Sequence, residues 1–347
     1  MIAASRPVQR PPEAKLLIVD RRGNISHAPR ARLIDCFRSG DLVIANDAAT
    51  LPASLQGRHM PTGAAVEVRL AGRRSLATDD VKHFLAIVFG AGDFRTRTEE
   101  RAPPPHLAPG DRLVLGPLSA TVERLHGHPR LIGLRFDGDA NAIWAGLARH
   151  GRPIQYAHVP LPLALWDVWT AIAGPPVAFE PPSAGFVLDW GLLLALRARG
   201  VAIATITHAA GISSTGDEAL DRRLPLDEPY RIPAVTARAL ARTRGRIIAI
   251  GTTVVRALEH RAARDGQVRP GEDLATKRVS ATTRLRIVDV ILTGTHEPGT
   301  SHYELLRAFT DDATLRRASE VLQACGYQTH EFGDSVWLER RAGLACL

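Results

Sequence analysis

The stretch RIIAIGTTVVRALEHRA, residues 246–262, joins a buried strand to the start of a helix. Four apolar residues lead to Gly251, two threonines follow, and apolar residues then recur at helical spacing, which predicts a helix beginning near Val254. A strand that turns directly into a helix is typical of a layered α/β domain. The two hydroxyl groups at the turn have two possible roles: Thr252 caps the helix, or the pair lines a ligand site.

Units of the same kind flank this stretch. Residues 15–47 have the pattern of a strand, a turn, a helix and a second strand, and helices alternate with strands again after residue 153. Residues 58–152 differ, because they hold short alternating runs such as AVEVRLAG (65–72) between glycine, proline and charged turns. That pattern is typical of a small antiparallel barrel. We therefore predict an α/β domain, residues 1–57 plus 153–347, interrupted by a β-barrel insertion, residues 58–152.

The composition indicates a cytoplasmic globular protein. The 347 residues are 45% hydrophobic, which is enough to bury the cores of two domains. No stretch approaches the roughly 20 apolar residues of a membrane span, and the first residues lack the apolar core of a secretory signal. The three cysteines, Cys36, Cys325 and Cys346, show neither close pairing nor metal-ligand spacing. Their odd number favours a reducing compartment.

The net charge of +8 comes almost entirely from arginine, since only three residues are lysine. The planar guanidinium group suits phosphate and carboxylate ligands. A basic balance of this kind permits binding of nucleic acid, but it also follows from a biased genome.

Several familiar motifs are incomplete. The GTT turn lacks the second glycine and the lysine of a phosphate-binding loop. Ser183 lacks the preceding glycine of a nucleophile elbow. His296 and His302 are six residues apart with a proline and a glycine between them, so they cannot share a helical face as metal ligands. No metal site is predicted.

The order of six segments resembles the S-adenosylmethionine:tRNA ribosyltransferase-isomerase family of queuosine biosynthesis. The segments are GDLVIANDAATLPASLQG (40–57), PPSAGF (181–186), ITHAAG (206–211), DEPYRIP (227–233), GTTVVRALE (251–259) and IVDVILTGTHEP (287–298). The last two are the most specific, because residue types and relative positions both match. The family fold is an α/β domain with an inserted barrel, in agreement with the pattern above.

The resemblance implies an enzyme that transfers the ribosyl part of S-adenosylmethionine to a 7-deazaguanine base in tRNA and rearranges it. S-adenosylmethionine is then a co-substrate, tRNA is the implied acceptor, and no other cofactor or membrane partner is expected. Such a site needs a base for the C5′ proton, a proton donor for adenine and a clamp for the methionine carboxylate. The matching positions are, as catalytic candidates, Asp47, His208 and His296, and as substrate-binding candidates, Asn46, Ser183, Gly185, Glu228, Tyr230, Gly251, Thr252, Thr253, Arg256, Asp289 and Thr293.

The chain also departs from the family pattern at ionisable positions. Arginines, histidines and a lysine of that pattern are replaced at Ala49, Ser54, Val187, Leu226 and Gly299. Losing an arginine at a carboxylate or phosphate site removes a charge-assisted hydrogen bond of about 1.5–3 kcal/mol. Three hypotheses stay open: a tRNA-modifying transferase-isomerase, a divergent enzyme with a different acceptor, and a non-catalytic nucleoside- or RNA-binding relative.

Single residues have structural interpretations beside the catalytic ones. His208 ends a buried strand, where a histidine is usually satisfied by neighbours rather than reactive. Asp47 could cap the next turn, and Arg256 could pair with a carboxylate of the protein. Glu259 and His260 are expected on the solvated side of their helix.

Overall fold

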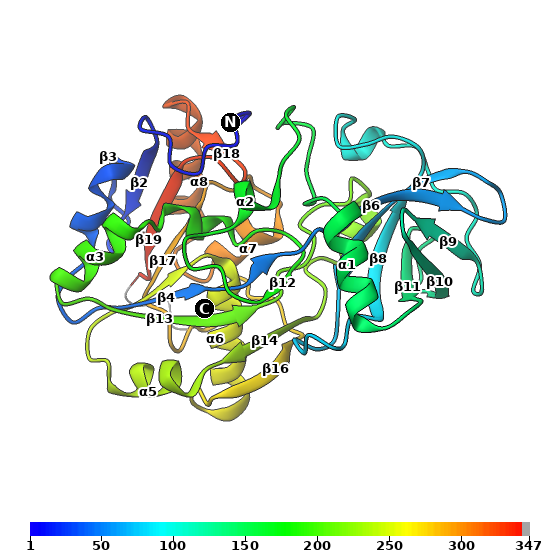
Figure 1. Cartoon of the computed structure of the whole chain (residues 1–347). Helices are drawn as coiled ribbons and strands as arrows, with labels where there is room; N and C mark the ends of the chain where they lie inside the picture. The colour runs from blue at the N-terminus through cyan, green and yellow to red at the C-terminus, as the bar shows by residue number, and fades with distance from the viewer. Residues whose placement is uncertain (342–347) are drawn as a thin grey trace.

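The computed structural model describes residues 1–341, and Cys346 therefore lies outside the described residues. A nine-stranded mixed sheet covered by helices forms the larger part of the molecule, and a closed six-stranded barrel lies beside it (Figure 1). This arrangement confirms the predicted fold class. The described residues include no helix that is both long enough and apolar enough to cross a membrane.

Four parallel strands form the centre of the large sheet. The strand order is β16 (Gly271–Ala275), β14 (Glu228–Ile232), β13 (Ala202–His208), β4 (Leu42–Asn46), β15 (Ile247–Ile250), β17 (Val290–Gly294), β19 (Ser335–Glu339), β2 (Lys15–Val19) and β3 (Ile25–Pro29). Strands β13, β4, β15 and β17 run parallel to one another, so their carboxyl ends meet at one edge.

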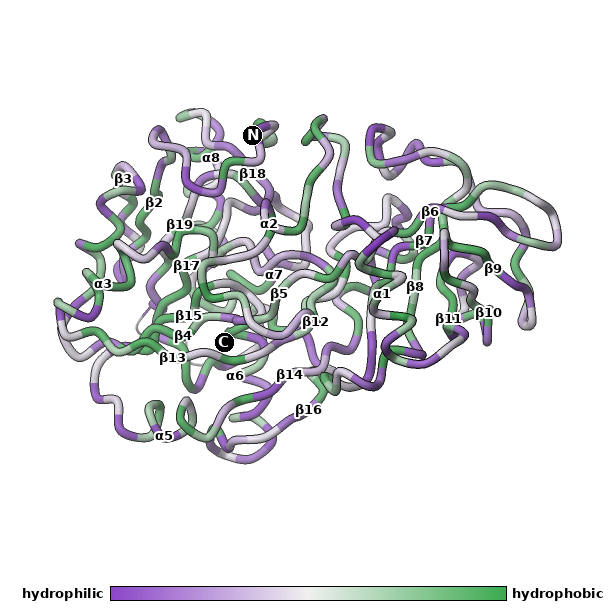
Figure 2. Tube along the Cα trace, viewed as in Figure 1, coloured by the Kyte–Doolittle hydropathy of each residue, from purple (hydrophilic) through white to green (hydrophobic). Residues whose placement is uncertain are grey.

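Both faces of this sheet are buried. Along β4, Leu42 and Ile44 join one hydrophobic cluster while Val43 and Ala45 join another, as the two-residue period of a strand requires. The first cluster is covered by α5 (Ala234–Arg242), α6 (Thr252–Asp265), α7 (Ser301–Leu306) and α8 (Asp312–Ala324). The second is covered by α3 (Trp190–Ala198) and the 3-10 helices η1 (Arg30–Cys36) and η3 (Ser183–Val187). Apolar residues accordingly follow the central strands in Figure 2.

The N-terminal segment differs in detail from the predicted strand, turn and helix. Residues 15–29 form a hairpin of β2 and β3, since Gly23 has a φ of 79° that a tight turn requires. The helix that follows is the short 3-10 segment η1 rather than an α-helix.

The barrel is closed, with its strands in the order β10 (Leu118–Leu125), β11 (Leu131–Phe136), β8 (His83–Phe89), β7 (Ala65–Gly72), β6 (Ser54–His59) and β9 (Arg112–Leu115). Helix α1 (Ala140–His150) packs against it, and its interior is filled by apolar side chains. Strand β6 crosses the boundary expected at residue 57, and Ser54 pairs with Arg152 where the chain leaves and re-enters. The division into two domains stays a prediction.

The barrel and the sheet are joined by packed apolar side chains. Barrel residues Ala71 and Phe89 share a cluster with Ile212, Leu220 and Leu224, which belong to the segment between β13 and β14. This segment contains α4 (Glu218–Asp221).

The remaining elements are short: β1 (Ile2–Ala3), β5 (Ala49–Thr50), η2 (Thr98–Glu100), α2 (Leu165–Val168), β12 (Pro176–Ala178) and β18 (Gln328–Thr329).

Candidate active site

Polar residues gather at the carboxyl edge of the four parallel strands. Asn46 ends β4, His208 ends β13, Gly251 follows β15, and Thr293 lies near the end of β17. Ligands of open α/β sheets bind outside this edge. The structure thus brings these four candidate residues to one edge of the sheet.

Asn46 connects three of the elements at this edge. Its Nδ2 donates to the carbonyl oxygen of His208 at 2.9 Å and to Thr253 Oγ1 at 3.4 Å. Its Oδ1 accepts from the backbone N–H of His208 at 2.9 Å and of Ala48 at 3.1 Å. All of these partners of the amide group belong to the protein, so Asn46 stabilises the ends of the strands.

His208 is fully buried and has protein oxygen atoms beside both ring nitrogens. Nδ1 donates to the carbonyl oxygen of Thr253 at 2.9 Å, and Nε2 lies 2.8 Å from Glu228 Oε2. Neither nitrogen is left to take a proton from a ligand. The geometry agrees with the structural interpretation of His208 rather than with the role of a base.

Glu228 is the buried carboxylate at the centre of this network. It accepts from Arg256 Nη1 through Oε2 and from the backbone N–H of Gly211 at 2.6 Å through Oε1. Burial opposes its charged form, but the charge of Arg256 and the hydrogen bonds from His208 and Gly211 outweigh burial and lower its pKa to about 2. Arg256 also donates to the carbonyl oxygens of Leu226, Ala275 and Lys277. The guanidinium group of Arg256 is therefore bound by partners inside the protein.

Helix α6 begins at Thr252, two residues earlier than predicted. Gly251 occupies the N-cap position with a φ of 91°, and no side chain caps the helix there. The interpretation of Thr252 as a cap is therefore wrong. A helix that starts without a side-chain cap presents backbone N–H groups of its first turn to any ligand at the edge.

The 3-10 helix η3 closes over this turn. A Cβ atom added to Gly251 would lie 3.3 Å from the Cβ of Ala184, and one added to Gly185 would lie 3.0 Å from Thr170 Cγ2. The small residues Gly251 and Ala184 let η3 approach the start of α6, and Gly185 lets it approach Thr170. The helix η3, which contains Ser183 and Gly185, therefore lies against the turn at Gly251.

His296 follows β17 and forms a pair with His302. Its Nε2 lies 2.7 Å from Thr293 Oγ1, and its ring stacks on that of His302 with centroids 4.9 Å apart. Burial lowers the pKa of His296 well below the usual histidine value, and burial also lowers that of His302. His296 is therefore a neutral imidazole at physiological pH. A turn, and not a shared helical face, brings the two histidines together.

Asp47 points away from His208. It accepts a hydrogen bond from Thr207 Oγ1 at 2.7 Å, and consecutive residues of a strand point to opposite faces. The three catalytic candidates consequently do not form one constellation of side chains.

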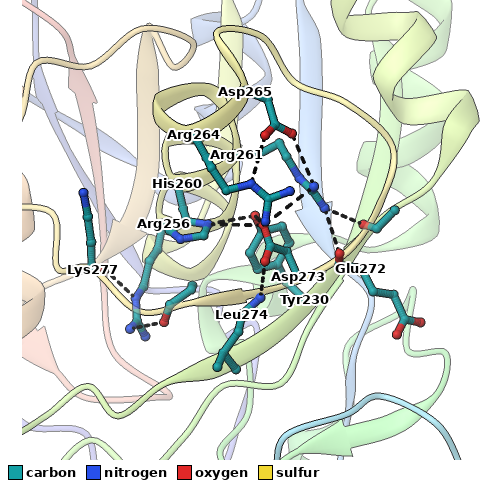
Figure 3. A network of polar contacts seen from close by, with 12 residues as sticks. Tyr230, Arg256, His260, Arg261, Arg264, Asp265, Glu272, Asp273, Leu274 and Lys277 are labelled. Atoms are coloured by element: carbon teal, nitrogen blue, oxygen red, sulfur yellow. Dashed lines mark hydrogen bonds and ion pairs between the residues drawn. The ribbon is translucent and has the colours of Figure 1, made fainter.

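Two other candidates have their polar groups directed away from the edge, although Tyr230 pairs with His208 in the sheet. The hydroxyl of Tyr230 lies 2.9 Å from His260 Nδ1 and donates to Asp273 at 3.3 Å, within the arginine-rich network beside α6 in Figure 3. Asp289 precedes β17 at the opposite end of the sheet, where it accepts from the backbone N–H of Ile247 and from Arg340.

Glu259 is buried and the side chain of His260 is only 11% exposed, so the expectation that both face solvent is wrong. Its carboxylate accepts from the backbone N–H groups of Arg286, Ile287 and Val288 at 2.7–3.0 Å. The residue fixes the chain that leads into β17.

Further titratable side chains near this edge were missed. Tyr156 donates to Glu180 and also to the carbonyl oxygen of Ser214 at 3.1 Å. Burial raises the pKa of Glu180 to about 7, although the hydrogen bond from Tyr156 acts in the other direction. Glu180 is separated from Ser183 only by two prolines. The sequence signal was the single carboxylate in an otherwise apolar run, AFEPP.

A second group consists of His158, His330 and Glu331, whose ligand atoms lie within 4.8 Å of one another. The rings of His158 and His330 stack with centroids 4.2 Å apart, and His158 Nε2 lies 3.0 Å from Glu331. The expectation that the protein has no metal site stays a prediction.

An α/β sheet with polar residues at its carboxyl edge and a barrel beside it is an arrangement typical of enzymes that bind their ligand at that edge. Residues 1–338 match the family described as queuosine biosynthesis protein, and the chain belongs to that family.

Individual relatives agree over nearly the whole chain. The chain is 34% identical to the S-adenosylmethionine:tRNA ribosyltransferase-isomerase of Sorangium cellulosum, over 96% of this chain and 94% of the relative. It is 31% identical to the protein of that name from Synechococcus elongatus, over 93% and 88%. The crystal structure of S-adenosylmethionine tRNA ribosyltransferase from Thermotoga maritima superposes on this chain with a TM-score of 0.50 and 23% sequence identity. The match covers 97% of this chain and 96% of the Thermotoga chain, which shows that the two share a fold.

Proposed function

We infer that the protein is an S-adenosylmethionine:tRNA ribosyltransferase-isomerase of queuosine biosynthesis. The observation that carries this conclusion is identity of about a third, over nearly the full length, to enzymes of that name. S-adenosylmethionine and tRNA are its substrates, which selects the first of the three hypotheses. A cytoplasmic location is proposed because tRNA is modified there.

For the first proton transfer, we propose His296 as the base. The sulfonium acidifies the adjacent C5′ proton, and a neutral imidazole accepts a proton where an imidazolium cannot. Burial keeps His296 neutral, and its place just beyond β17 leaves it at the carboxyl edge. His302 stacks on the ring and fixes its orientation.

For ligand binding, we propose the start of α6. The first-turn N–H groups and the Thr252 hydroxyl suit the methionine carboxylate or a ribose oxygen of S-adenosylmethionine. Asn46, His208, Glu228 and Arg256 then act as positioning residues, because their hydrogen bonds hold Thr253 and its neighbours in place.

For the departure of adenine, we propose Glu180 as the proton donor. A carboxyl group with a pKa of about 7 is largely protonated in slightly acidic solution and half protonated near neutrality. Asp47 is half-buried at the other face of the same edge and remains a candidate for a later proton transfer.

The experiment follows two signals of the reaction. Exchange of the C5′ proton of S-adenosylmethionine with solvent deuterium reports the base, and release of adenine in the presence of tRNA bearing the deazaguanine base reports transfer. His296→Ala should abolish both, while His83→Ala, at an exposed histidine of the barrel, should change neither. Wild-type exchange in His296→Ala would reject His296 as the base. A wild-type protein that releases no adenine with both substrates would reject the proposed function.

A further inference from the structure

A group of unpaired arginines lies where the barrel meets the larger domain. We define the junction patch as Arg74 in the β7–β8 loop, Arg124 in β10 and Arg223 after α4. All three side chains are exposed. None of them has a carboxylate partner within 4.0 Å in the part of the chain that the structure describes, whereas neighbouring Arg222 is paired with Glu218.

Two of the three arginines form hydrogen bonds with one histidine, His126. Arg124 Nε donates to His126 Nε2 at 3.1 Å, and Arg223 Nη1 donates to the carbonyl oxygen of His126 at 2.8 Å. Burial, followed by the charges of Arg124, Arg223 and Arg74, lowers the pKa of His126. Because His126 accepts from Arg124, the ring is neutral and adds no further repulsion. The patch concentrates positive charge that an external anion would neutralise.

The patch is also fixed next to the buried network of the site. Leu220 and Leu224, on either side of Arg223, pack with barrel residue Ala71. The carbonyl oxygen of Leu226 accepts a hydrogen bond from Arg256, which pairs with Glu228. A ligand bound to the patch therefore touches both the barrel and the segment between β13 and β14, and this segment continues to Leu226, which is hydrogen-bonded to Arg256 of the site network.

We propose that the junction patch binds phosphates of the tRNA backbone beside the base that is modified. The inference rests on the proposed function and adds to it the surface that receives the polyanion. Guanidinium groups form bidentate, charge-assisted hydrogen bonds with phosphate, and three of them supply up to three contacts. Phosphate contacts set the position of a nucleic acid, and the site then reads the base.

The test compares tRNA binding over a range of salt concentrations. In the variant Arg74→Ala/Arg124→Ala/Arg223→Ala, we expect the slope of log affinity against log salt to fall by about 2–3 and affinity near physiological salt to fall by about 50-fold or more. The control Arg238→Ala/Arg242→Ala/Arg244→Ala removes the same charge from exposed, unpaired positions in and after α5. It should leave the slope unchanged.

Two further measurements separate the possible results. Replacing the three patch arginines with lysine should restore most of the slope, since point charges still contact phosphate, and S-adenosylmethionine binding by calorimetry should be the same in all variants. Equal salt slopes for the patch variant, the control and the wild type would overturn the proposal that the patch binds tRNA. In that case, tRNA modification by the wild type would still support the proposed function. A wild-type protein that neither binds nor modifies tRNA would overturn both.

Discussion

Replacing Arg256 with alanine tests the buried network most directly. The guanidinium is 5% exposed and donates to Glu228 and to three backbone carbonyl oxygens. Removing one partner of a buried ion pair costs about 3–5 kcal/mol, because the other charge stays buried without compensation. With an unfolding entropy of about 2.1 cal/mol/K per residue, this loss lowers the thermal midpoint of a chain of this length by about 4–7 °C.

Thermal and denaturant unfolding followed by circular dichroism measure the effect. Arg264→Ala, on the exposed side of the same helix, is the control and should have a much smaller effect. The double variant Arg256→Met/Glu228→Gln should recover part of the loss, since it removes both charges. A single variant as stable as Arg264→Ala, or a double variant no better than Arg256→Ala, would refute the reasoning.

The pH dependence of stability in acid provides a second test of the pair of Glu228 and Arg256. The folded pKa of Glu228, about 2, lies below the usual value of about 4.3 in an unfolded chain. Its contribution is therefore complete above about pH 4.3 and is lost as the pH falls toward 2. The stability difference between the wild type and Arg256→Ala should shrink over that window, and a constant difference would contradict the assignment.

Two further predictions concern the edge of the sheet. Glu180→Gln should stabilise the protein above pH 7 and have little effect at pH 4. The reason is that a carboxyl group whose folded pKa is raised to about 7 loses its contribution to the free energy of unfolding as the pH rises through that value. Equal unfolding curves for the variant and the wild type at pH 8 would contradict this. Thr252→Val should weaken S-adenosylmethionine binding about tenfold in a calorimetric titration while the thermal midpoint stays within about 2 °C, since no side chain caps α6. The exposed Thr282→Val is the control, and unchanged affinity in Thr252→Val would remove the GTT turn from the site.

The elements of the fold were predictable because their signals are local. Strand β15 followed directly by α6, and the two-residue alternation of the barrel strands, are periodic patterns that burial on one or both faces imposes. The start of α6 was misplaced by two residues because Gly251 takes the cap position with a positive φ, and the sequence pointed to Thr252 instead.

The side-chain partners were less accessible to sequence reasoning. The pair of Glu228 and Arg256 and the contact of His208 with Thr253 join residues on different elements, so no spacing rule reports them. Glu259 looked solvent-facing because a charged residue in a helix usually is, yet three backbone N–H groups satisfy its carboxylate. Hydrogen bonds between a polar side chain and a distant segment can be identified only when the three-dimensional structure is known.

The position of β2 in the sheet has a consequence for biosynthesis. Lys15–Val19 pairs with Ser335–Glu339, so the hairpin of β2 and β3 joins the sheet only after β19 has left the ribosome. The barrel, in contrast, has all its strand partners within the first 136 residues. The nascent chain can therefore close the barrel early, whereas the hairpin stays without its β19 partner until residues 335–339 have been synthesised, and an exposed strand edge of this kind is prone to aggregation.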